Sequence, residues 1–305
     1  MYKVSFTRYK IRLTKMIIEQ NTEFKAIRLL VKYWYRSFSA YEIVKEAKIS
    51  APRVYDVVKK LESKGVIIRN EKKVRLNFNN LFAYTTKLMY DSERLLDLSE
   101  EEQMKINQVF SVLKKEYDTN LLAFMIFGSV ASGEQTKKSD IDLLAIVKEK
   151  KEIDYKKRGL LNLGSLNIIE KKESEFENDY LMANDLVLNV LINGIIISDN
   201  GIIRFLLNKP LPMPSNEVIM QKKERLDVLK ERLFALLKEK NYEELVEQLK
   251  LFIIERGRIL LLQKNIIPSS KKNIIDNLKK IDKQLYRDYT TLNERNVKDI
   301  LEKNV

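Results

Sequence analysis

The chain has 305 residues, 45% of them hydrophobic and 32% charged, with a formal net charge of +13, a balance typical of a globular protein of two or three domains. It contains no cysteine and no histidine, which excludes disulfides, thiolate and imidazole metal ligands, and every catalytic triad that uses histidine. No apolar run reaches the roughly 20 residues of a membrane span and the first 21 residues lack the pattern of a signal peptide, so we expect a cytoplasmic protein with no membrane partner.

The positive charge is concentrated at the start of the chain. Residues 1–80 hold 19 Lys and Arg against seven Asp and Glu, a net charge of +12, which leaves the other 225 residues at +1. Because neutralisation of phosphates supplies most of the non-specific affinity for nucleic acid, this excess predicts a nucleic-acid-binding domain. A lysine-rich solvated surface is the alternative explanation.

Three helices and a hairpin are predicted in this basic region. Residues 24–35 place apolar side chains on one helical face, residues 40–47 form a second helix, and a third begins after Ser50 and ends near Gly65. Residues 66–78 then predict two strands around a charged turn. This order resembles a winged helix-turn-helix domain over residues 22–80, within an N-terminal domain that we place at residues 1–80.

The resemblance to a winged helix implies double-stranded DNA as a partner, with the third helix facing the major groove. The third helix and the tip of the hairpin supply the predicted DNA-binding side chains, which are Arg53, Tyr55, Lys59, Lys60, Lys72 and Lys73. The alternatives are a solvated surface and a protein-docking module, since winged helices also serve in that role.

Residues 81–117 are predicted to form a helical connector, and the next segment carries two motifs. Residues 121–127 are a continuous apolar run of strand length that ends at Gly128-Ser129. Residues 140–147 predict a second strand that opens with Asp140 and Asp142. Strand periodicity places both carboxylates on one face, about 6.6 Å apart along the backbone. Two carboxylates in this arrangement can bind hard divalent cations for phosphoryl chemistry.

Gly128-Ser129, ten intervening residues and then Asp140 and Asp142 resemble the signature of the nucleotidyltransferase superfamily that includes DNA polymerase beta, kanamycin nucleotidyltransferase and the minimal nucleotidyltransferases. The resemblance covers about residues 118–200, and we place the domain at residues 118–212. It implies that the Gly-Ser turn holds the triphosphate and that the aspartates hold Mg²⁺ or Mn²⁺, with ATP or another NTP as substrate. Glycine permits the close backbone approach that a triphosphate needs.

A third carboxylate on a neighbouring strand is expected to complete the metal site or to accept the proton of the acceptor. Glu170, which ends a predicted strand over residues 166–169, is the candidate for this catalytic role. The weaker candidates are Glu173, Asp154 and Asp199.

The chain departs from the superfamily pattern beside the Gly-Ser turn. Val130 and Ser132 stand where many relatives have arginine, so positive charge next to the triphosphate is missing there. Lys137 is the cation that we expect to replace it in nucleotide binding, with Lys138 as the alternative. A degenerate site that binds nucleotide without turnover is therefore an open alternative.

Residues 213–305 follow a proline-rich linker and predict an α-helical bundle with leucine stripes. The arrangement is similar to the helical partners of minimal nucleotidyltransferases, including the HEPN family. HEPN ribonucleases use an Arg and His motif, and the absence of histidine means that this activity cannot be carried over. We expect the bundle to position a substrate or to form a homodimer.

The expected fold class is α+β multidomain, with a winged helix-turn-helix, a nucleotidyltransferase mixed sheet with flanking helices, and a helical bundle. The expected function is metal-dependent transfer of NMP from NTP to a protein, nucleic-acid or small-molecule acceptor, coupled to DNA binding. Similarity to antitoxin-type nucleotidyltransferases favours a protein hydroxyl as acceptor. The alternatives are a non-catalytic DNA-binding transcriptional regulator or antitoxin with a degenerate nucleotidyltransferase fold, and an RNA end-modifying enzyme.

Overall fold

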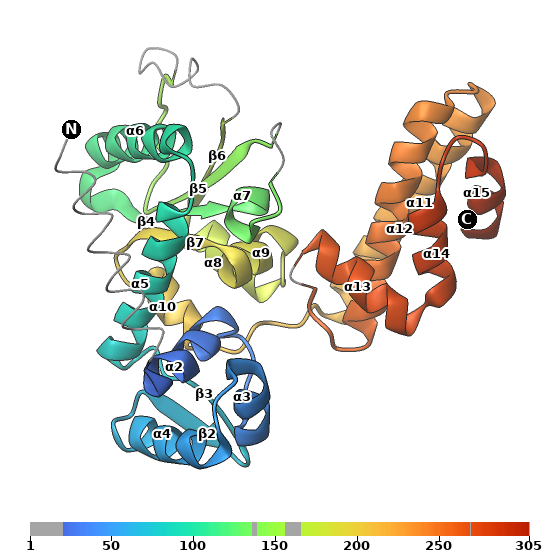
Figure 1. The fold of residues 1–305 in the computed structure, drawn as a ribbon. Helices are drawn as coiled ribbons and strands as arrows, with labels where there is room; N and C mark the ends of the chain where they lie inside the picture. The colour runs from blue at the N-terminus through green and yellow to red at the C-terminus, as the bar shows by residue number, and fades with distance from the viewer. Residues whose placement is uncertain (1–20, 136–138, 156–165, 269, 305) are drawn as a thin grey trace. The chain divides into compact units, whose positions relative to one another are not determined.

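The computed structural model describes residues 21–135, 139–155, 166–268 and 270–304. The chain divides into two compact units, which we describe separately (Figure 1). The first contains the chain up to residue 176 together with residues 190–211, and the second contains residues 177–189 and the chain from residue 212 onward.

The first unit begins with a winged helix, as the sequence predicts. Its elements in chain order are α2 (Thr22–Lys32), β1 (Phe38–Ser39), α3 (Ala40–Ala47), α4 (Ala51–Ser63), β2 (Ile67–Asn70) and β3 (Lys73–Leu76). The strands form an antiparallel sheet in the order β1-β3-β2, so β1 adds a strand that the sequence does not predict. Ser39 and Glu42 form a capping box that starts α3 immediately after this short strand.

Two long helices connect the winged helix to the central sheet. α5 (Leu81–Leu96) begins after Asn80, whose side chain accepts hydrogen bonds from the first backbone N–H groups of the helix. α6 (Glu100–Tyr117) begins at a capping box formed by Ser99 and Glu102. Most of residues 81–117 is therefore helical in the structure.

The central sheet has four strands in the order β6-β5-β4-β7. This part of the chain contains, in order, η1 (Asp118–Asn120), β4 (Leu121–Phe127), α7 (Gly128–Ser132), β5 (Ile141–Val147), β6 (Leu166–Lys172), α8 (Glu173–Leu181), α9 (Asp185–Asn193), β7 (Ile195–Asp199) and α10 (Ile202–Leu207). Residues 177–189, which include most of α8 and the start of α9, belong to the second unit. β4 pairs antiparallel with β5 and β7, while β5 and β6 are parallel, which makes the sheet mixed as expected.

One face of this sheet packs against α6. Ile106, Val109 and Leu113 of the helix share a buried core with residues of β4 and β5, among them Phe124 and Leu143. The strand residues that alternate with these are buried as well, so both faces of β4 and β5 are covered. Burial on both faces explains why the two strands read as continuous apolar runs.

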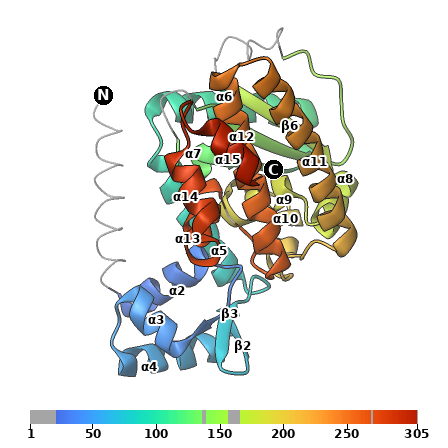
Figure 2. The same ribbon diagram turned by 90° about the vertical axis from the view of Figure 1, so that its right-hand side faces the viewer.

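The second unit is mainly a helical bundle with its own core (Figure 2). Its helices after residue 212 are α11 (Asn216–Lys238), α12 (Tyr242–Gln263), α13 (Lys271–Ile281), α14 (Lys283–Thr291) and α15 (Val297–Asn304). The apolar residues at 274, 278, 281 and 285 have the spacing of one helix. They belong to two helices, because Asp282 leaves helical geometry and its side chain accepts from the N–H of Leu285 to start α14. The α+β multidomain class is confirmed.

No helix within the described part of the chain is long and apolar enough to span a membrane.

Candidate nucleotide site and DNA interface

The bend after β4 lies directly against the carboxylate of Asp142. Gly128 has φ +71°, in the left-handed region that favours glycine. A Cβ added to Gly128 would lie 2.1 Å from Oδ2 of Asp142, so any other residue would displace this carboxylate. Phe127 and Asp142 are paired across the two antiparallel strands, and this register brings the bend and the carboxylate together. Glycine therefore allows the bend to approach the carboxylate without displacing it.

The two aspartates flank a buried residue at the start of β5. Asp140 is exposed just before the strand, Ile141 is buried in the core under α6, and Asp142 is half-buried. Asp142 lies against the bend, on the side of the strand away from α6, and Asp140 is the exposed residue that precedes the strand. The donor set at this edge consists of carboxylate oxygens, which suit a hard divalent cation.

Asn167 is a neighbour of this site that sequence reasoning missed. It pairs in register with Asp142 across the parallel strands β5 and β6. Its Nδ2 donates a hydrogen bond of 2.9 Å to Oδ1 of Asp142. With the amide rotated by half a turn, Oδ1 of Asn167 would face the same space as the Asp142 carboxylate and supply a neutral oxygen ligand. The only sign of it in the sequence is its position as the second residue of β6, which matches the position of Asp142 in β5.

The structure does not bring Glu170 together with the aspartates. Glu170 lies three positions after Asn167 on β6, and an odd spacing along a strand places the two side chains on opposite faces. Its carboxylate instead accepts hydrogen bonds from the hydroxyls of Tyr117 and Tyr155. Burial, reinforced by the bond to Glu170, raises the pKa of Tyr117 to about 12, and the pKa of Tyr155 is raised for the same reasons. Both hydroxyls therefore stay protonated and occupy the carboxylate.

The weaker acidic candidates, Asp199, Glu173 and Asp154, do not form a cluster of three acidic side chains with the two aspartates either. Asp199 accepts hydrogen bonds from the Tyr84 hydroxyl at 2.5 Å and from backbone N–H groups at the start of α10. Glu173 begins α8, and Asp154 precedes Tyr155. Within the described ranges, no three Asp or Glu side chains lie close enough together to hold a metal ion. Lys137 and Lys138 lie outside the described residues.

The winged helix presents a groove between α4 and the hairpin. The groove has a volume of about 310 Å³, and its lining includes Tyr55, Lys59, Arg69 and Lys72. Tyr55 is 64% exposed, and Arg53 and Lys73 are exposed as well. The structure thus brings together predicted side chains from α4 and from the hairpin, and adds Arg69, which sequence reasoning did not select.

Two of the basic side chains in this region already have acidic partners. Nζ of Lys60 lies 2.5 Å from Oε2 of Glu23 on α2. Arg69 donates two hydrogen bonds, of 2.9 and 2.8 Å, to the carboxylate of Glu62 and so braces β2 against α4. To contact a phosphate, Lys60 would have to leave or share its ion pair with Glu23, so it is a weaker candidate for DNA contact than Lys59 or Lys72.

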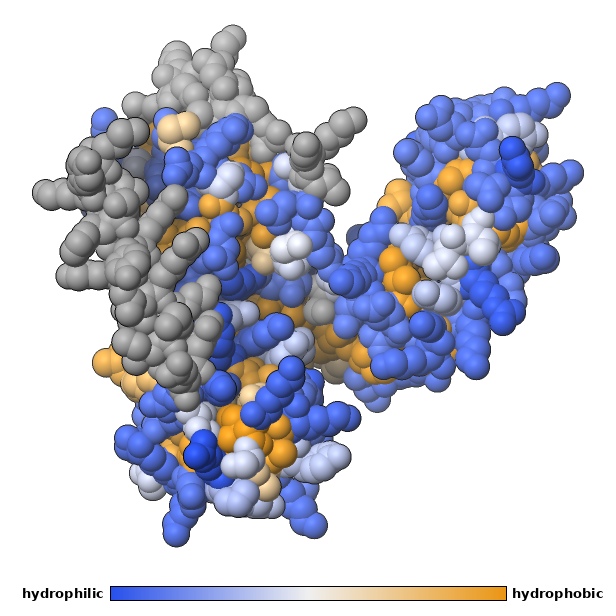
Figure 3. All heavy atoms as spheres, in the orientation of Figure 1, coloured by the Kyte–Doolittle hydropathy of each residue, from blue (hydrophilic) through white to orange (hydrophobic). Residues whose placement is uncertain are grey.

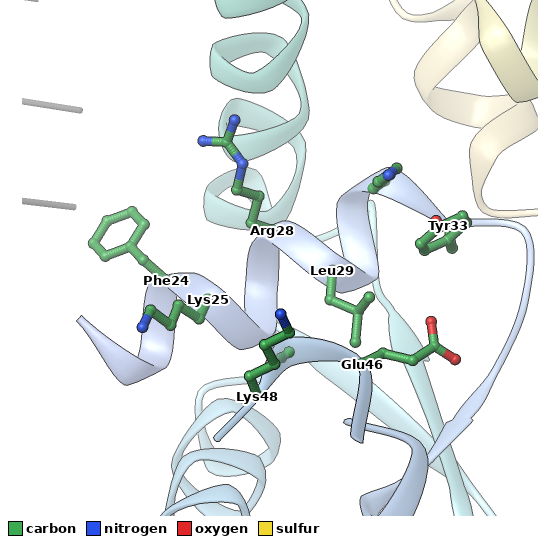
Figure 4. Close-up of a pocket in the computed structure, with 9 residues that line it drawn as sticks. Phe24, Lys25, Arg28, Leu29, Tyr33, Glu46 and Lys48 are labelled. Atoms are coloured by element: carbon green, nitrogen blue, oxygen red, sulfur yellow. The ribbon is translucent and has the colours of Figure 1, made fainter. Parts of the chain in front are cut away.

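A larger hollow lies on the winged helix between α2 and the end of α3 (Figure 4). It has a volume of about 890 Å³, and its polar lining is mostly basic, with Lys25, Arg28, Lys32 and Lys48 against Glu46. In Figure 3 apolar side chains gather on the visible face of the winged helix among hydrophilic ones. The hollow contains no residue of the central sheet, so it is separate from the Gly128 bend.

Residues 105–201 match the family model described as polymerase beta, nucleotidyltransferase, and residues 20–90 match the one described as sugar-specific transcriptional regulator TrmB. A solved structure of a nucleotidyltransferase-like protein from Exiguobacterium sibiricum is 14% identical over 65% of this chain and 72% of that chain, with a TM-score of 0.37. The comparison with curated proteins gave no match. The two family matches establish that the chain joins a TrmB-type winged-helix region to a nucleotidyltransferase region of the polymerase beta type.

Proposed function

We propose that the region over residues 118–212 binds a nucleoside triphosphate with a divalent cation and transfers its nucleoside monophosphate to an acceptor hydroxyl. The observation that supports this most directly is the close approach of the Asp142 carboxylate to a left-handed bend at Gly128, where a Cβ would displace it. A bend without a side chain, next to a carboxylate, is what a phosphate and its counter-cation require. The acceptor is a protein, a nucleic acid or a small molecule.

Each residue of the bend and of β5 has a separate role in this proposal. Gly128 allows the triphosphate to approach the backbone, and Ser129 offers its N–H and hydroxyl as donors. Asp140 and Asp142 would hold Mg²⁺ or Mn²⁺, with Asn167 beside them as a neutral ligand. When bound, the cation neutralises phosphate charge and polarises the α-phosphorus. Glu170 has no part in the site, because it faces the other side of the sheet.

The reaction forms a bond from the acceptor oxygen to the α-phosphorus while the bond from that phosphorus to its bridging oxygen breaks. Pyrophosphate leaves, and the hydroxyl proton passes to solvent. The protein residues act by orienting the phosphates against the bend, which removes rotational freedom before the chemical step. Lys137 stays a candidate for a further phosphate contact.

A second function, nucleotide sensing without turnover, is favoured by Asn167. Where a third carboxylate would add negative charge and a proton acceptor next to Asp142, the chain carries an amide. Such a site could bind Mg²⁺ and ATP and influence a transcriptional regulator or an antitoxin without transferring a nucleotide. This candidate uses the same residues, so only a turnover measurement separates it from the first.

The test is transfer of label from ATP to protein or nucleic acid in cell extract with the full chain and Mg²⁺. We expect transfer from α-labelled but not from γ-labelled ATP. The combined Asp140→Asn and Asp142→Asn substitutions should lower it by at least about a hundredfold, since changes to outer-shell partners of metal ligands alone cost tenfold to a hundredfold. The Asn forms keep the size of the side chains, so the comparison isolates their charge.

The two candidates predict different results in the same assay. Transfer that persists in the Asp140→Asn and Asp142→Asn variant would refute the proposed site. If no transfer occurs but Mg²⁺ with ATP raises the melting temperature of the protein, sensing is supported instead. An Asn167→Asp variant that gains transfer would show that the missing carboxylate limits the reaction.

We further propose that the winged helix binds double-stranded DNA through α4 and the hairpin. The support is the groove that Tyr55, Lys59 and Lys72 line, together with the net charge of +12 on residues 1–80. Arg53 and Lys73 extend this surface, and Lys60 contributes less because Glu23 already binds it. A homodimer formed through the helical bundle is a further part of this proposal, since two winged helices read two half-sites.

A further inference from the structure

α5 carries charged side chains in the protein interior. Among the residues that the structure describes, the buried charged side chains are Lys87, Asp91 and Asp288, and the first two lie one turn apart on α5. Burial lowers the pKa of Lys87, while its bond to Asp91 opposes that shift. Charges are costly to bury, so a buried pair calls for a structural or functional reason.

Arg94, one turn beyond Asp91, reaches three backbone carbonyls of the nucleotidyltransferase region. Its Nη2 donates to the carbonyl oxygens of Ala131 and Asn193, both at 2.5 Å, and its Nη1 donates to that of Gly194 at 3.1 Å. Ala131 belongs to α7, the short helix that begins at Gly128. Arg94 is therefore a direct link between α5 and the element that carries the Gly128-Ser129 bend.

Asp91 holds Arg94 in place. Its Oδ1 accepts from Nη1 of Arg94 at 3.2 Å. Its Oδ2 accepts from the backbone N–H of Ile196 on β7 at 3.0 Å and from Nζ of Lys87 at 2.5 Å. The carboxylate is fully buried and anchored to the sheet, so the guanidinium has a fixed position relative to β4 and β7.

α7 needs such external support, because a helix of five residues is far below the length at which helices are stable by themselves. The orientation of the bend against Asp142 must therefore come from tertiary contacts. Arg94 supplies one near the C-terminal end of α7, where a cation is also favoured by the helix dipole.

We propose that Arg94 is a positioning residue of the nucleotide site, which fixes the Gly128-Ser129 bend against Asp142 through its bond to α7. The claim that nucleotide affinity depends on Arg94 rests on the function proposed above. The claim that Arg94 orders the bend does not.

Arg204 provides a matched control. Its Nε and Nη2 donate to the carbonyl oxygens of Phe78 and Asn79, both at 2.8 Å, and its guanidinium stacks on the ring of Tyr84. Arg204 thus also joins two parts of the first unit through backbone carbonyls, but none of these bonds involves α7. Lysine at either position keeps the charge and loses the planar fork that serves several carbonyls at once.

The experiment compares the full chain with Arg94→Lys and Arg204→Lys by hydrogen exchange and by binding of ATP with Mg²⁺. The backbone N–H of Glu134 bonds to the carbonyl of Ser129 at 2.9 Å and reports on the bend. In Arg94→Lys we expect exchange over residues 128–134 to accelerate and ATP to bind more weakly, each by about tenfold or more, because charged hydrogen bonds are lost. In Arg204→Lys both should stay within about twofold, while its melting temperature falls to a similar extent.

The outcomes separate the two proposals. Exchange over residues 128–134 that is equal in the two variants overturns the role of Arg94. If the native chain binds ATP and Arg94→Lys binds it as tightly as Arg204→Lys does, the role of Arg94 in nucleotide affinity is overturned while the proposed function stands. If the native chain binds no ATP but Arg94→Lys loosens the bend, the proposed function fails and the positioning of the bend by Arg94 is supported.

Discussion

Gly128 and Gly133 have nearly the same φ but differ in what surrounds them. Both have positive φ, at +71° and +72°. A Cβ on Gly128 would overlap the Asp142 carboxylate, whereas a Cβ on Gly133 would meet no atom within 4 Å. Alanine at Gly133 therefore adds backbone strain alone, whereas alanine at Gly128 adds the same strain and also displaces the Asp142 carboxylate.

Gly133→Ala should lower the free energy of unfolding by about 1 kcal/mol and leave nucleotide binding unchanged, because only left-handed strain is added. Gly128→Ala should cost more stability and weaken binding of ATP with Mg²⁺ by about tenfold or more, since the Asp142 carboxylate must move. Calorimetric titration and chemical denaturation measure both effects. Equal nucleotide affinities in the two variants would contradict the site.

The residues of the bend and of β5 are predictable from sequence, whereas the residues of β6 are not. Gly128, Ser129, Asp140 and Asp142 belong to two adjacent strands, and their spacing alone indicates the pairing. The neighbour of Asp142 on β6 depends on the register between parallel strands that are separated by a long crossover. Glu170 is expected from its place at the end of a predicted strand, whereas the register pairs Asn167 with Asp142 and Glu170 with Ala145.

At the level of elements, α4 and the hairpin line one groove, and the lysines of these elements differ in whether an acidic side chain binds them. Lys72 lines the groove with Tyr55, while Lys60 on α4 is bound by Glu23 at 2.5 Å. Substitution of either lysine by alanine removes one positive charge, so the net charge of the two variants is identical.

Lys72→Ala should weaken DNA binding and reduce the slope of log affinity against log salt by about 0.9, the value for one lost phosphate contact. Lys60→Ala should change both quantities less, because the lysine it removes was already neutralised by Glu23. Titration of duplex DNA by fluorescence anisotropy at several salt concentrations measures the slopes. A loss for Lys60→Ala as large as that for Lys72→Ala would refute this placement of the DNA.

Element prediction succeeds where periodicity is long and fails where an element is short. α3 and α4 follow from their apolar spacing and from their first-turn residues. β1 has only two residues, so no alternation could indicate it. The stripe that joins α13 and α14 continues across Asp282 in the sequence, and only the backbone shows that a helix ends there. The bonds of Arg94 to backbone carbonyls leave no pattern in the sequence.

At the scale of the molecule, hydrogen bonds and an ion pair within the first unit connect the winged helix, α5 and the region of the central sheet. Nε1 of Trp34 donates to the carbonyl of Leu191 at 3.0 Å, and Nη1 of Arg28 lies 2.7 Å from Oε2 of Glu93 on α5. Tyr84 on α5 bonds to Asp199 at the end of β7. The proposed DNA-binding surface and the proposed nucleotide site are thus parts of one compact unit, so we expect both to be lost together when that unit unfolds.

The central claim is that a divalent cation and a nucleotide bind together at the Gly128 bend with Asp142. The most direct measurement is the thermal unfolding of the full chain with ATP, with and without Mg²⁺, in the native protein and in Asp142→Asn. At a ligand concentration one hundred times the Kd we expect a stabilisation of about 2.7 kcal/mol for the native chain with both ligands. Neither ATP alone nor Asp142→Asn with both ligands should show it. Equal stabilisation of Asp142→Asn, or of the native chain without Mg²⁺, would contradict the account.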